Sequence, residues 1–161
     1  MSSTLVQRAV LPLRLVLILG FALLLLLQTF SLPGQFAHMA QEDPDAEAWR
    51  WPLTAFAAVL LLCVQVVVVC TWKLLTMVKE DRIFSDRALV WVDVIIGAIG
   101  TACVLLTGLL VALLLTYDDP GLPILTCLVL VAGTAVGLLV FVMRSLLVQA
   151  TTLRTDMEAV I

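Results

Sequence analysis

Charge and histidine are scarce in this sequence. Only 13% of the 161 residues are charged, whereas 63% are hydrophobic, and a single histidine is present. A soluble domain of this length would need much more charge to cover its surface. That histidine, His38, lies outside the apolar segments. A haem held by histidine ligands inside a helical bundle is therefore excluded.

Recognisable catalytic and metal-binding motifs are absent as well. The sequence has no Gly-rich phosphate loop, no serine nucleophile elbow and no zinc-binding HExxH motif. The four cysteines form no CxxC pair and are expected to be small packing residues within apolar segments: Cys63, Cys70, Cys103 and Cys127. We therefore expect no enzymatic activity, no cofactor, no bound metal and no nucleic-acid partner.

Long apolar segments dominate what is present. Four of them approach or exceed the ~20 residues that a helix needs to cross a bilayer core of ~30 Å. They cover residues 10–32, 52–77, 88–116 and 124–148. The fold class predicted is all-α: a polytopic membrane protein, with one antiparallel bundle of four transmembrane helices over residues 1–161. Residues 149–161 are predicted to form a cytoplasmic helical tail.

The first segment has some features of a signal peptide, because arginines precede its apolar run. A cut after Ala37 or Ala40 would, however, leave Gln35 or His38 where a small residue is required. We expect an uncleaved helix, and we expect Pro33-Gly34 to end the first span. Pro120-Gly121 is expected to turn the third span into the fourth.

The basic residues predict the orientation in the membrane. With four spans, eight of the nine lysines and arginines fall on one side, and only Arg50 falls on the other. The side of Arg50 carries the acidic stretches QEDPDAEAWRW and YDDPGLP. The positive-inside rule then puts both termini in the cytoplasm of a bacterial cell, with the chain as a multi-pass protein of the plasma membrane.

Three charged residues lie within spans at similar depths. Counted from the outer span ends, Lys73, Asp93 and Arg144 differ in depth by only about 5 Å. We predict an inner-leaflet charge cluster in which Asp93 pairs with Arg144, with Lys73 as a second partner or a snorkelling neighbour. The alternative is that all three side chains simply reach headgroup water.

Small residues mark faces along which helices approach closely in lipid. Gly97 and Gly100 share a face of the third segment with Asp93, and Gly133 and Gly137 share a face of the fourth with Arg144. We expect these two faces to pack together within one chain. Gln65 and Thr71, in the second segment, are expected to form interhelical hydrogen bonds, and a site for a transported solute is the alternative there.

The tail has an apolar heptad seam. Its members are spaced 3, 4, 3, 4, 3 along the chain: Met143, Leu146, Ala150, Leu153, Met157 and Val160. The seam is too short to establish a coiled coil. The tail could lie on the inner membrane surface, pair with a partner or fray.

Two stretches, WKLLTMVKEDRIFSDRALVWVDVIIGAI and LLVQATTLRTDMEAVI, resemble the bacterial domain-of-unknown-function family 2975. The family's Phe-Ser element is matched by Phe84-Ser85, and its ending by Leu153, Arg154 and Asp156. The glycine and asparagine that often flank the Phe-Ser element are missing here. The resemblance implies a small four-span protein of the bacterial plasma membrane, often encoded beside a helix-turn-helix regulator, and it implies no activity.

Two hypotheses about function follow. The first is a non-enzymatic membrane protein that interacts with or regulates a partner, or forms a homo-oligomer, through its cytoplasmic loop and tail. The alternative is a small transporter or channel-like subunit with polar residues lining a path. The scarcity of acidic residues in the spans favours the first hypothesis, since Asp93 is the only one.

Overall fold

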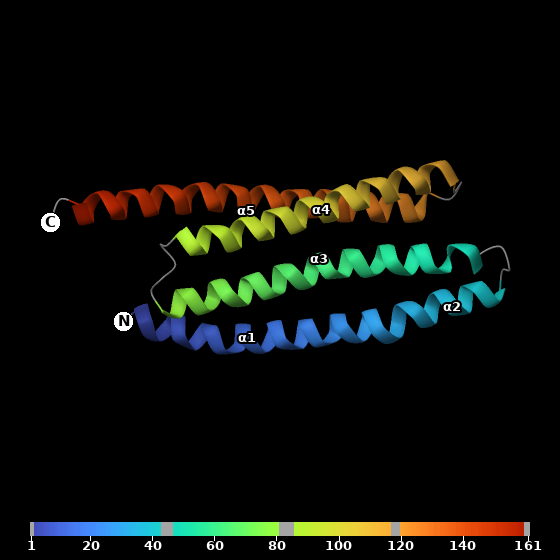
Figure 1. Ribbon diagram of the computed structural model, residues 1–161, viewed down its shortest axis with the longest axis horizontal. Helices are drawn as coiled ribbons and strands as arrows, with labels where there is room; N and C mark the ends of the chain where they lie inside the picture. Colours follow the sequence, from blue (N-terminus) through green and yellow to red (C-terminus); the bar gives the residue numbers. More distant parts are fainter. Residues whose placement is uncertain (1, 43–46, 81–85, 117–119, 160–161) are drawn as a thin grey trace. The chain divides into compact units, whose positions relative to one another are not determined.

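The computed structural model describes residues 2–42, 47–80, 86–116 and 120–159, and these are helical almost throughout (Figure 1). In chain order the elements are α1 (Ser2–Leu26), the π-helical turn η1 (Leu27–Ser31), α2 (Leu32–Glu42), α3 (Glu47–Lys79), α4 (Asp86–Thr116) and α5 (Gly121–Ala159). The chain divides into two compact units, Met1–Val68 and Val69–Ile161, which are described separately.

Four helical stretches are long and apolar enough to cross a bilayer, which confirms the expected number of spans. They are Leu11–Gln35, Trp51–Lys79, Arg87–Thr116 and Gly121–Leu153. Large apolar side chains stay exposed along them, and Val104 and Leu115 are 72% and 83% exposed. Such an apolar exterior suits a protein surrounded by lipid and not by water.

The first apolar span ends at Gln35, directly after Pro33-Gly34, but the helix does not end there. Helical structure continues through this dipeptide to Glu42, by way of the π turn at Leu27–Ser31. In that turn the Leu32 N–H donates to the Leu27 carbonyl, five residues back. A proline ring in a regular helix clashes with the carbonyl four residues before it. The wider turn directly before Pro33 changes that spacing, so the helix can go on.

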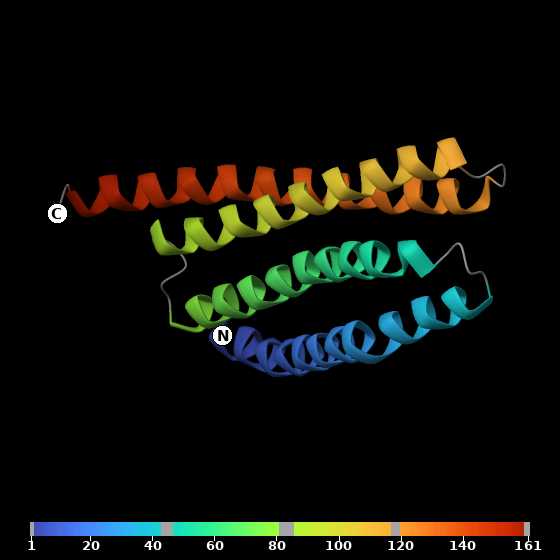
Figure 2. The ribbon, with the colours of Figure 1, turned by 45° about the vertical axis from the view of Figure 1, so that its right-hand side comes forward.

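In the first unit, α1, η1 and α2 lead in one direction, and the part of α3 up to Val68 returns beside them (Figures 1 and 2). The start of α3 is at Glu47, five residues before Pro52, where the second span was expected to begin. Residues 43–46 lie outside the described parts of the chain.

In the second unit, α4 and α5 lie side by side (Figure 2). Gly121, directly after Pro120, begins α5, and Pro123 lies in its first turn. A proline fits there because the first N–H groups of a helix have no partner within it. The first ladder bond is then donated by the Ile124 N–H to the Pro120 carbonyl, at 3.1 Å. The expected turn is therefore at this place, and the helix begins three residues earlier than predicted.

The C-terminal tail is a direct continuation of α5. The helix runs without a break for 39 residues to Ala159, a length of about 58 Å. This exceeds the ~30 Å of a bilayer core. Residues 149–159 therefore extend the fourth apolar helix and do not form a separate element.

Candidate functional site

An ion pair joins α4 to α5. The Arg144 guanidinium donates through Nε to Asp93 Oδ1 and through Nη2 to Asp93 Oδ2, the second hydrogen bond being 3.0 Å long. This two-bond arrangement matches the planar fork of a guanidinium to a carboxylate. The Arg144 side chain is 35% exposed and that of Asp93 is 50% exposed. The pairing expected from the sequence is thus present in the structure.

Lys73 does not join the pair. Its side chain is exposed and makes no hydrogen bond or ion pair with another described residue. The structure therefore brings together two members of the predicted charge cluster, Asp93 and Arg144, and leaves the third apart. The stretch of α4 from Asp93 to its end at Thr116 is as long as the stretch of α5 from its start at Gly121 to Arg144. The two paired residues are therefore at the same level along the two helices.

The contact between α4 and α5 is built on one glycine face and not two. A Cβ on Gly137 would lie 3.0 Å from the Ile99 Cγ2, and one on Gly133 would lie 3.6 Å from the Cys103 Sγ. Gly97 and Gly100 are different, since a Cβ on either would meet nothing within 4 Å. The close contacts are therefore made by the α5 glycines, which receive larger side chains of α4.

The order of these contacts shows how the two helices run. Asp93, Ile99 and Cys103 ascend along α4, while their partners Arg144, Gly137 and Thr134 descend along α5. Within the second unit, α4 and α5 therefore run in opposite directions along these contacts.

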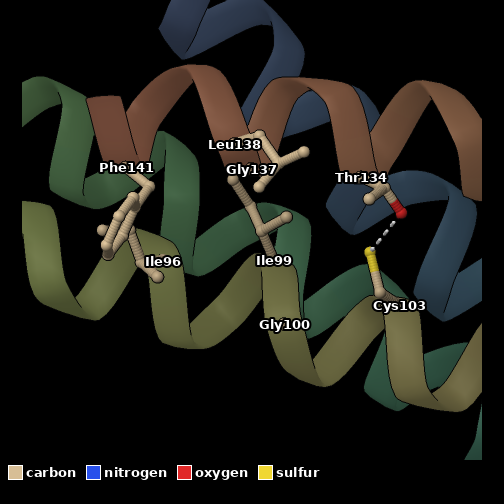
Figure 3. A pocket seen from close by; sticks show the side chains of 8 residues that line it. All are labelled: Ile96, Ile99, Gly100, Cys103, Thr134, Gly137, Leu138 and Phe141. Carbon is tan, nitrogen blue, oxygen red and sulfur yellow. Dashed lines mark hydrogen bonds between the residues drawn. The ribbon is translucent and has the colours of Figure 1, made fainter. Parts of the chain in front are cut away.

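An apolar groove lies between α4 and α5, with a volume of about 260 Å³. Figure 3 shows Phe141 and Ile96 toward one end, Ile99 beneath Gly137 in the middle, and Cys103 facing Thr134 at the other end. The Cys103 Sγ and the Thr134 Oγ1 are 3.9 Å apart. Gly100 and Leu138 complete the lining. The groove offers apolar surface and little hydrogen-bonding capacity, because the Thr134 hydroxyl already donates to the Leu130 carbonyl.

A second polar contact lies within the first unit. Gln65 on α3 is only 6% exposed, and its Nε2 donates to the Gln28 Oε1 at 2.9 Å. The Gln28 Nε2 in turn donates to the Ala58 carbonyl, at 3.3 Å. The expected interhelical bond of Gln65 is thus present. Its partner was missed, although Gln28 is also a lone amide in an apolar run. It belongs to the π turn η1, a kind of turn that is frequent at functional sites.

Threonine hydroxyls in the spans are mostly satisfied within their own helices. Each of the following donates to the carbonyl four residues before it: Thr29, Thr76, Thr101, Thr107, Thr126, Thr134, Thr151 and Thr152. Back-bonding of this kind lets a hydroxyl reside in an apolar helix. These hydroxyls thus have an acceptor within their own helices.

The described residues contain no group of three or more His, Cys, Asp or Glu side chains that could hold a metal ion. The four cysteines are free thiols; Cys70 is buried and Cys127 is exposed. Of the residues that resemble the family's loop and tail, Phe84 and Ser85 lie outside the described residues. Leu153 and Asp156 are exposed on the last turns of α5, and Arg154 belongs to the same helix.

Four apolar helices, with an interhelical ion pair and an interhelical amide pair, define a multi-pass helical membrane protein. The profile of the family described as "Protein of unknown function (DUF2975)" matches residues 34–161, so the chain belongs to that family. This confirms the family resemblance found in the sequence, and the match covers α3, α4, α5 and most of α2. No curated protein and no solved structure matches the chain.

Proposed function

We propose that this protein is a non-enzymatic, multi-pass protein of the bacterial plasma membrane that binds or regulates a protein partner. Its four spans form one antiparallel bundle with both termini in the cytoplasm, and the partner is engaged by the loop before α4 and by the end of α5. The distribution of basic residues supports the orientation. The shape of the second unit supports the role of α5.

The observation that carries the proposal is the length of α5 relative to α4. Beyond the Asp93–Arg144 pair, α5 continues to Ala159, whereas α4 reaches only to Asp86 in the same direction. The end of α5 therefore extends past the start of α4 by about two turns, or ~12 Å. A projecting helix end of this kind is available for packing against another helix or groove.

The side chains on this projection have an apolar side. Leu153 and Met157 are 64% and 66% exposed, and they are one helical turn apart on one face. Thr152 and Asp156 are exposed on the adjacent, polar face. Leu153 ends the apolar stretch Gly121–Leu153 and Met157 lies beyond it, so the apolar side of α5 continues past the span and is available to a partner.

Site-specific photo-crosslinking in cells tests this role. A photoreactive residue at position 153 or 157 should give one discrete crosslinked product, and the same residue at 152 or 156 should give much less. With the photoreactive residue at position 157, the substitution Leu153→Ser should remove the crosslinked product. With the photoreactive residue at position 153, Met157→Ser should do the same. Thr152→Ala serves as the matched control. Equal crosslinking from both faces, or an unchanged product after removal of the rest of the projection, would contradict the proposal.

One observation favours the alternative, a small transporter or channel-like subunit. The buried Gln65 is hydrogen-bonded to the half-buried Gln28, which belongs to a π turn in the apolar part of the first unit. Flux of ions and small solutes into liposomes that contain the purified protein would test it. Flux that falls on Gln65→Leu or Asp93→Asn but persists in Cys127→Ala would support the alternative. Absence of flux in all proteins would leave partner binding as the better account.

A further inference from the structure

The apolar groove between α4 and α5 leads to the Asp93–Arg144 ion pair. Ile96 lies one turn after Asp93 on α4, and Phe141 lies one turn before Arg144 on α5. Residues spaced by three or four along a helix share a face. The pair therefore stands on the same two helix faces as Ile96 and Phe141, which lie at one end of the groove in Figure 3. An elongated molecule in the groove would meet the pair at that end.

The ion pair retains free hydrogen-bonding capacity. A guanidinium has five N–H donors, and Arg144 uses one on Nε and one on Nη2. The remaining donors, including both on Nη1, are given to none of the described residues. The Asp93 carboxylate is half exposed, so its oxygens can accept further bonds. A ligand would thus meet cationic donors and an anionic acceptor side by side, with no net charge.

The position along the helices places the pair near a membrane boundary. Asp93 and Arg144 are equally far from the opposite ends of their spans, at Thr116 and Gly121. This distance is about 35 Å along each helix, and a bilayer core is ~30 Å thick. When those opposite ends lie at one interface, the pair lies at the level of the headgroups on the other side, and the groove lies in the hydrocarbon region.

We infer that the groove and the ion pair form a binding site for a phospholipid with an ethanolamine headgroup. One acyl chain lies along the groove, the phosphate accepts hydrogen bonds from Arg144, and the primary ammonium donates to Asp93. The groove volume of about 260 Å³ is below the roughly 300–1,000 Å³ of pockets that enclose small ligands. The acyl chain is therefore in contact with the protein on one side and with bulk lipid on the other.

Charge and hydrogen-bonding chemistry select this headgroup over two others. Phosphatidylglycerol brings a net negative charge to an arginine that Asp93 already neutralises. Phosphatidylcholine has a quaternary ammonium without an N–H to donate to Asp93. Of the three, the ethanolamine headgroup alone matches both members of the pair. This inference does not depend on the proposed binding of a protein partner.

The first test compares the three lipids. The purified full chain in detergent is given phosphatidylethanolamine, phosphatidylglycerol and phosphatidylcholine with identical acyl chains, and retained lipid is counted by native mass spectrometry. Phosphatidylethanolamine should be retained about two- to fivefold over each of the others, the range expected for exposed charge contacts. The double variant Asp93→Asn with Arg144→Gln should retain all three equally. Equal retention by the natural chain would overturn the inference.

The second test fills the groove. Gly100 lines it, and a Cβ there meets nothing within 4 Å, so the side chain of Gly100→Leu can start into the groove and take up acyl space. Gly108 has the same open surroundings on α4 but does not line the groove, which makes Gly108→Leu the matched control. Retention of phosphatidylethanolamine should fall in Gly100→Leu and persist in Gly108→Leu.

Two results of the second test would overturn the inference. Equal retention by the two leucine variants would show that lipid does not use the groove. A change from dimer to monomer in Gly100→Leu alone would show that a second copy of the chain occupies it. Circular dichroism checks that both variants fold. If one of them does not fold, the lipid preference of the natural chain in the first test decides whether the inference holds.

Discussion

Ile99 of α4 fills the space left by the missing side chain of Gly137 on α5. The Ile99 Cγ2 lies 3.0 Å from the point where a Cβ of residue 137 would stand, a separation tighter than most real Cβ contacts. The β-branched side chain of Ile99 has restricted rotamers and cannot easily move aside. This contact therefore fixes how closely the two helices approach, and it lies in the middle of the apolar groove.

A larger side chain at residue 137 should separate α4 from α5. Gly137→Leu is expected to lower the free energy of unfolding by about 1–3 kcal/mol, the usual cost of overpacking. The thermal midpoint in detergent should fall accordingly. Gly97→Leu is the control, because a Cβ there meets nothing within 4 Å. A loss as large in the control as in Gly137→Leu would show that the glycine contact does not set the helix spacing.

The Asp93–Arg144 pair should show coupling in a double-mutant cycle. Asp93→Asn and Arg144→Gln are each expected to lower the thermal midpoint, since each leaves one charge without its partner. The double variant should be no less stable than the worse single variant. Lys73→Gln, at an exposed lysine outside the pair, should leave the cycle unchanged. Strictly additive losses would mean that the two charges act independently.

The amide pair of the first unit should contribute modestly to stability. Gln65→Leu leaves the Gln28 carbonyl oxygen without its donor, and the expected loss is about 0.5–2 kcal/mol, as for other interhelical bonds in membranes. Gln28→Leu should cost a similar amount, and the two losses should not add. Thr29→Val, which removes only a bond within its own helix, is the comparison. Full additivity in thermal denaturation would argue against the bond between the amides.

The exposure of the thiols predicts their labelling. Cys70 is 2% exposed, whereas Cys127 is exposed on α5. Among single-cysteine variants in mild detergent, the Cys127 protein should react with a maleimide well before the Cys70 protein, and denaturation should remove the difference. Rapid labelling of Cys70 in the folded protein would show that this part of α3 is open.

The number of spans could be predicted from the sequence because runs of apolar residues have few other uses at this length. The pairing of Asp93 with Arg144 followed from helical phase and depth together. Phase alone did not show which residues of α4 meet the α5 glycines, since positions 96, 99 and 103 fit a helical face as well as Gly97 and Gly100 do.

The missed features have local causes. The partner of Gln65 could not be named from the sequence, because helical phase within one segment does not show which residue of another segment it meets. Proline usually interrupts a helix, and the sequence does not show that a π turn can absorb the disturbance. The distance by which α5 extends past α4 depends on the residue at which the helix ends. The apolar heptad seam of the tail does not predict that residue.

Membrane topology tests the central claim most directly, namely four spans with both ends of the chain in the cytoplasm. Reporter domains that are active on only one side of the membrane can be fused after Gln41, Asp81, Asp119 and Ile161. The first and third fusions should read periplasmic, and the second and fourth cytoplasmic. A periplasmic signal from the fusion at Ile161 would contradict both the orientation and the placement of the α5 end beside a cytoplasmic partner.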